Sequence, residues 1–177
     1  MKASAVSEID YLVNGWAEGS ATLDSNGLSM FAEKLGSIFK VKSDEVAILG
    51  LVNGGKFLRF IVPEILQAVG TIPLNSNSAL AARTAREKRP EMQNTFAGSR
   101  HASVFEGVPM GRGEGVLIQK IMSVPILFEK EVVGVVQVCR KGRTQSQAGA
   151  DFESGELRTL QGLSETLARF VLLANKD

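Results

Sequence analysis

Two pairs of β-rich segments, each joined by a short turn, constrain the fold of this chain more than any other feature. The first pair occupies residues 45–62 and turns at Asn53-Gly54-Gly55, a strong tight-turn signal. The second pair occupies residues 116–139 and turns at Glu129-Lys130. Because a short turn joins only neighbouring antiparallel strands, the sequence predicts an antiparallel sheet.

Amphipathic segments surround these hairpins. Apolar residues spaced by three and four predict helices near the start of the chain, from Leu28 to Lys40 and from Phe152 to Ala174, and good helix formers predict another over 79–88. Residues 91–115 read as a loop, and a loop of this length in a compact domain is usually functional. Helices that cover an antiparallel sheet define an α+β fold.

Size and composition indicate one globular unit. The 177 residues are divided into an N-terminal helix over 1–24, for packing or dimerisation, and a domain over 25–177 that includes the C-terminal helix. The net charge of +1 argues against a nucleic-acid partner. There is no apolar run long enough to span a membrane and no apolar leader, so a cytoplasmic location is expected.

The residue types argue against catalysis. The chain has one cysteine, Cys139, and one histidine, His101, so a Cys–His catalytic pair would need both. Cys139 falls at the end of an apolar strand, where cysteine commonly acts as a small inert hydrophobe. Two soft ligands are too few for a zinc site. We therefore expect neither an enzyme nor a metal site.

Two segments carry a family resemblance. Ser123-Val124-Pro125-Ile126, followed by the run 132–138 with its Val-Gly-Val-Val-Gln sequence, resembles a hairpin of GAF domains. Upstream, the stretch from Ile72-Pro73-Leu74 to Arg89-Pro90 resembles the helix beside the binding pocket of that family. The resemblance covers about residues 25–175.

This resemblance implies a GAF/PAS-like sheet of about six antiparallel strands. The terminal helices would cover one face and mediate a homodimer. A helix and the long loop would enclose a small-molecule pocket on the other face. The implied function is a sensor that binds an unidentified small molecule and signals through an unknown partner protein. No cofactor is implied, because the pocket loop has no cysteine for a bilin and His101 is a weak candidate for binding haem.

Seven residues are candidate ligand contacts. Arg83 matches the pocket helix of the family and is the preferred anchor for an anionic ligand. Arg59 shares a strand face with apolar residues, so it either reaches solvent at an edge strand or anchors a ligand. Strand alternation puts Gln119 on a face with Ile121 and Ser123, and Gln137 on a face with Val135 and Cys139. Buried amides such as these need hydrogen-bond partners from backbone or ligand. The full set is Arg59, Ser78, Arg83, Asn94, Phe96, Gln119 and Gln137.

Two other functions compete with the sensor. In the first, the domain is an interaction module whose pocket is filled by its own side chains, with Phe57, Phe96 and Phe105 as candidates. The second is a redox enzyme such as a methionine sulfoxide reductase. That branch of the family needs several cysteines for its redox cycle, so it is the least favoured reading.

Overall fold

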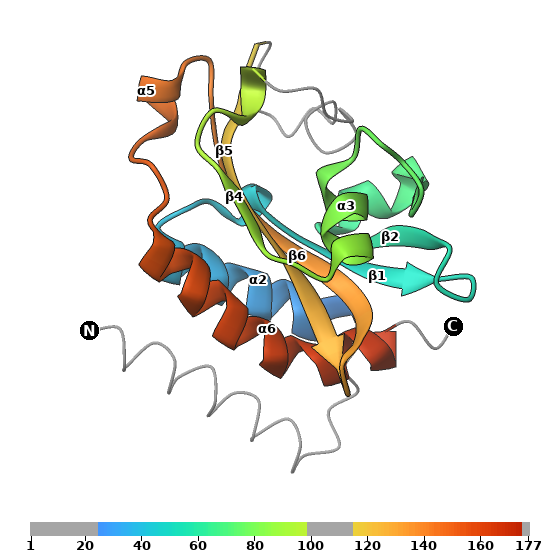
Figure 1. The fold of residues 1–177 in the computed structure, drawn as a ribbon. Coiled ribbons are helices and arrows are strands. Elements are labelled where there is room, and N and C mark those ends of the chain that lie inside the picture. The colour runs from blue at the N-terminus through green and yellow to red at the C-terminus, as the bar shows by residue number, and fades with distance from the viewer. Residues whose placement is uncertain (1–24, 99–114, 175–177) are drawn as a thin grey trace.

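A single antiparallel sheet with helices on both faces forms the domain (Figure 1). The computed structural model describes residues 25–98 and 115–174. Its six strands lie in the order β3-β2-β1-β6-β5-β4, and every neighbouring pair is antiparallel. The α+β class, the antiparallel pairing and the six strands predicted from the sequence are confirmed. The bounds are α2 Ser25–Phe39, η1 Ser43–Glu45, β1 Val46–Val52, β2 Phe57–Val62, η2 Glu64–Val69, β3 Thr71–Pro73, α3 Leu80–Glu87, β4 Glu91–Gln93, η3 Phe96–Gly98, β5 Leu117–Phe128, β6 Glu131–Gly142, α5 Gln145–Ala148 and α6 Ser154–Ala174.

The two faces of the sheet carry separate hydrophobic cores. In β1, Val46 and Ile48 face one way and Ala47 and Leu49 the other, as the two-residue period of a strand requires. We call the first the helix-side core, since α2 and α6 pack on it, and the second the α3-side core. Figure 1 shows the long helices α2 and α6 side by side on one face, with α3 on the opposite face.

Both predicted hairpins are present. Asn53, Gly54 and Gly55 all have positive φ angles between β1 and β2. Glu129 and Lys130, at φ 49° and 70°, form the two-residue turn that pairs Phe128 with Glu131. Left-handed backbone at both turn positions matches the right-handed twist of the paired strands.

The two short edge strands, β3 and β4, were not predicted from the sequence. The stretch 91–115, read as a loop, begins with β4 and η3, so that reading is wrong for residues 91–93 and 96–98. β3 and β4 have three residues each, too few to show a period. Only their pairing with β2 and β5 makes them strands.

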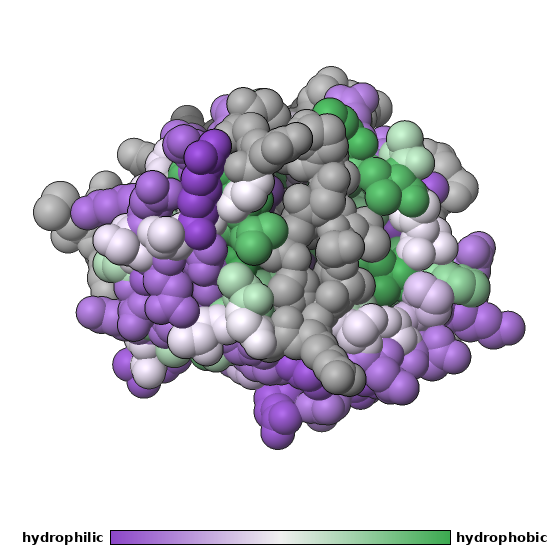
Figure 2. Space-filling view, turned by 90° about the horizontal axis from the view of Figure 1, so that it is seen from above, coloured by the Kyte–Doolittle hydropathy of each residue, from purple (hydrophilic) through white to green (hydrophobic). Residues whose placement is uncertain are grey.

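Several predictions fall outside the described residues. They concern the N-terminal helix within 1–24, most of the long loop, His101 and Phe105. In the described ranges 25–98 and 115–174, no helix is long and apolar enough to cross a membrane. The face seen in Figure 2 has small hydrophobic patches, with most of the hydrophilic residues toward its outline.

Candidate functional site

A short chain of polar side chains crosses the α3-side core. Thr84, on the buried face of α3, has its hydroxyl 2.7 Å from the hydroxyl of Ser123 in β5. Gln137 in β6 donates from Nε2 to the Ser123 hydroxyl over 3.1 Å. Ser123 and Gln137 are register partners, so the sheet itself sets this contact. We call Thr84, Ser123 and Gln137 the polar string.

The polar string is fully enclosed. Its members are at most 5% exposed, and the Thr84 hydroxyl also lies 2.9 Å from the carbonyl oxygen of Leu80. A buried polar group without a partner costs about 1–3 kcal/mol, so these contacts compensate for burial. The string is neutral, and apolar side chains of α3, β1 and β6 surround it.

Arg83 lies at the rim of this face and forms a two-pronged ion pair with Glu91 of β4. Its Nε and Nη2 donate to the two carboxylate oxygens over 3.0 and 2.6 Å. Burial raises the pKa of Glu91, but hydrogen bonds from Arg83 and Gln93, with attraction to Arg83 and Arg89, outweigh it and hold that pKa below its usual range. The predicted anion anchor is therefore paired with a carboxylate of its own chain.

Arg59 lies on the other side of the sheet from the polar string. In β2, Leu58 and Phe60 belong to the α3-side core, so Arg59 and Phe57 face the opposite way. Arg59 pairs in register with Gly50. The structure thus separates Arg59 from the residues beneath α3, and it places Phe57 away from the space that it was expected to fill.

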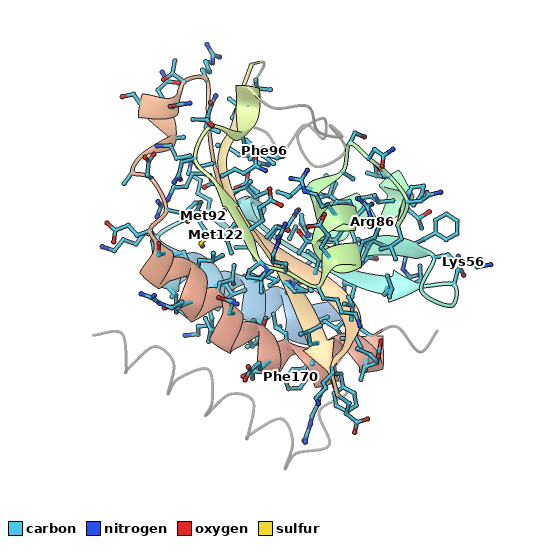
Figure 3. The ribbon with its side chains drawn as sticks, viewed as in Figure 1. Lys56, Arg86, Met92, Phe96, Met122 and Phe170 are labelled. Carbon is cyan, nitrogen blue, oxygen red and sulfur yellow. The ribbon has the colours of Figure 1, made fainter. Side chains whose placement is uncertain are left out.

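Asn94 and Phe96 follow β4 and have different surroundings. Asn94 donates to the carbonyl of Phe152 over 3.1 Å and accepts from the Phe152 N–H over 2.8 Å. Phe96 is 5% exposed and packs in the α3-side core; Figure 3 shows it beside β5, above the level of α3. Of these two residues, Phe96 is the one that lies among the apolar groups around the polar string.

Ser78 and Gln119 complete the predicted set. Ser78 is exposed just before α3, with its hydroxyl 3.4 Å from that of Ser76. Gln119 is the extra residue at a bulge in β5, and its Nε2 donates to the carbonyl of Gly142 over 2.9 Å. This bulge interrupts the strand alternation from which the face of Gln119 was deduced.

The structure therefore brings together Gln137 and Phe96 on the α3 side, with Arg83 at its rim. Thr84 and Ser123 join them, although the sequence analysis did not nominate either residue. The sequence held a clue to each of the two residues. Thr84 carries a hydroxyl group on the otherwise apolar, alanine-rich face of α3, and Ser123 is the first residue of the motif that carried the family resemblance.

A separate groove of about 360 Å³ lies between β5, α6 and the end of α3. Val124 and Pro125 contribute apolar surface, and Ser164 of α6 lines the other wall. The Lys88 ammonium reaches toward the carbonyl of Lys130 at 3.4 Å. Pro125 lies in β5 beyond the residues that pair with β4, and a proline at such an unpaired strand edge is common protection against pairing with another chain.

In the part of the chain that the structure describes, no group of three or more histidine, cysteine or acidic side chains is arranged to hold a metal ion. No protein-family model matches the chain, and no curated protein sequence does so either.

Solved structures do resemble the chain. The GAF domain of an Acinetobacter phosphoenolpyruvate-protein phosphotransferase superposes with a TM-score of 0.72 at 15% identity, covering 98% of this chain and 94% of that one. The corresponding Coxiella burnetii domain gives a TM-score of 0.72 at 12% identity, with the same coverage of 98% and 94%. A free methionine-R-sulfoxide reductase from Neisseria meningitidis gives 0.65 at 12% identity, covering 98% and 91%.

These likenesses establish the fold. The chain has the GAF-domain architecture over nearly its full length, as the hairpin and helix motifs predicted. At 12–15% identity these structures do not assign a role to any individual residue of this chain, because one fold hosts many activities.

Proposed function

We propose that this chain is a regulatory domain that binds a small molecule on the α3 side of its sheet. The polar string supports this proposal most directly. Ligand sites in proteins are mostly apolar and contain a few converging hydrogen-bonding groups. Thr84, Ser123 and Gln137 provide such groups from three different elements, beneath the helix that the family resemblance assigns to the pocket.

The string also suggests how a ligand would be recognised. The side chains are uncharged, and each is already hydrogen-bonded inside the protein. A ligand that reaches them must therefore offer donors or acceptors in exchange, since an apolar group would leave them unpaired. This favours a ligand with a neutral polar function.

A regulatory role is more consistent with the side chains than a catalytic one. The thiol of Cys139 is fully buried in the α3-side core. A reactive cysteine needs access and a stabilised thiolate, and burial among apolar groups opposes both. We extend the proposal to a homodimer formed through the terminal helices, which signals to a partner protein.

Native mass spectrometry of the purified protein tests the proposal, by comparison with the denatured mass. A reproducible extra mass on the native protein, lost in Gln137→Leu and retained in the exposed control Ser37→Ala, would support it. An adduct that persists in Gln137→Leu would place the ligand elsewhere. The same spectra report whether the protein is a dimer.

A second candidate is an interaction module without a ligand. Phe96 is buried in the α3-side core and the polar string is satisfied internally, so this face is already packed in the described residues. A bare native mass, unchanged after incubation with a metabolite extract, would favour this function over the sensor.

A further inference from the structure

Arg140 of β6 lies where three segments meet. Its Nη2 donates to the carbonyl of Phe39, the last residue of α2, over 3.1 Å. The same nitrogen lies 3.3 Å from a carboxylate oxygen of Glu156 in the first turn of α6. A cation at the C-terminus of α2 is favourable because helix carbonyls carry partial negative charge there.

Arg140 also holds the segment before α6. Nη1 donates to the carbonyl of Ala150 over 2.7 Å, and the guanidinium lies 4.0 Å from the ring centre of Phe152. Arg140 is only 12% exposed, so water screens these contacts weakly. Its register partner Lys120 is bound to Asp151 of the same segment over 2.8 Å.

Phe152 connects this junction to the other face of the sheet. Both backbone polar groups of Phe152 bond to the side chain of Asn94. Asn94 follows β4 directly, and Phe96, two residues later, belongs to the α3-side core. The contacts Asn94–Phe152–Arg140 therefore join the backbone segment that carries Phe96 to the ends of α2 and α6.

Glu156 makes the start of α6 sensitive to this arrangement. Its second carboxylate oxygen accepts the backbone N–H of Glu153 over 2.8 Å, which is half of a capping box. One carboxylate thus caps α6 and also binds Arg140. A shift of Arg140 would change the cap of α6 and the last carbonyl of α2 together.

We propose that Asn94, Phe152 and Arg140 couple the α3-side core to the ends of α2 and α6. A displacement of the segment that carries Asn94 and Phe96 moves the Phe152 backbone, and Arg140 transfers that movement to both helices. The use of this coupling in signalling rests on the proposed function, whereas the coupling itself needs no ligand.

A double-mutant cycle on unfolding equilibria tests the coupling. Asn94 and Arg140 share Phe152 as a partner, so we expect Asn94→Ala and Arg140→Met to be non-additive by about fivefold or more in the unfolding constant. The matched control is Arg86→Met, which removes an arginine that binds two backbone carbonyls near α3, at 2.6 and 2.7 Å. Asn94→Ala with Arg86→Met should be additive within about twofold.

Hydrogen exchange tests the coupling in a second way. If Asn94 only stabilised its own segment, its substitution would not change the exchange rates of amides in α2 and α6. In Asn94→Ala, amides in the last turn of α2 and the first turn of α6 should exchange about fivefold faster or more, although the hydrogen bonds of Asn94 go to Phe152, which precedes α6. Arg86→Met should leave those amides unchanged. Exchange that rises only near residues 94–98 and 150–153, together with an additive cycle, would overturn the proposal. Either result is independent of whether native mass spectrometry finds a ligand.

Discussion

Gly134, at the centre of the family-like hairpin, should tolerate no side chain. It lies in β6 between β1 and β5, opposite Gly50 and Ile126. A Cβ built there would be 2.2 Å from the carbonyl oxygen of Leu49 and 3.1 Å from Cγ1 of Val171 in α6. The first contact is with backbone, so no side-chain rotation relieves it.

The cost of Gly134→Ala follows from this geometry. Moving the two central strands apart strains the core by about 1–3 kcal/mol. It also weakens one or two ladder hydrogen bonds, worth about 1 kcal/mol each. The total is roughly 2–5 kcal/mol, and with a urea dependence of about 2 kcal/mol per molar the unfolding midpoint should fall by roughly 1–2.5 M.

Gly162 provides the matched control. It is exposed in the middle of α6, and a Cβ there would meet no atom within 4 Å. Gly162→Ala should therefore stabilise the protein by about 0.5–1 kcal/mol, because alanine is the better helix former. Urea unfolding followed by circular dichroism measures both variants. A midpoint shift smaller than about 0.5 M for Gly134→Ala would refute the close approach of β1 and β6.

Three further results are expected. The pKa of Glu91 is lower in the folded state than in the unfolded one, so its contribution is present at neutral pH and is lost as pH falls below its ordinary value of 4.5. Glu91→Gln should therefore cost at most about 1 kcal/mol at pH 7, since the pair with Arg83 is partly exposed, and the difference from wild type should vanish in acid unfolding titrations. Cys139 is fully buried, so its thiol should react with a disulfide reagent only at the rate of global unfolding; rapid labelling of the native protein would contradict its position. Glu45 is 6% exposed and accepts the N–H groups of Lys42 and Lys141, so Glu45→Gln should lower the free energy of unfolding by about 1–3 kcal/mol in urea titrations, because one of those donors would face an amide NH₂.

Only some residues of the candidate site could be predicted from the sequence. Gln137 was placed correctly on the face of β6 with Val135 and Cys139, because strand alternation is a local rule that held along that strand. The rule did not determine which helices cover that face, so Arg59 and Phe57 were grouped with the pocket although they lie on the opposite side. Thr84 and Ser123 are 39 positions apart, and no local pattern links them.

The sequence by itself determined the hairpins, the antiparallel sheet and the amphipathic helices, because turn residues and apolar periodicity act within a few residues of the chain. Tertiary structure alone decided three other features. β3 and β4 exist as strands only through their neighbours, Arg83 is paired with Glu91 across eight residues, and Arg140 meets a carbonyl 101 positions away. Such contacts depend on where distant segments pack, and packing is a property of the whole chain.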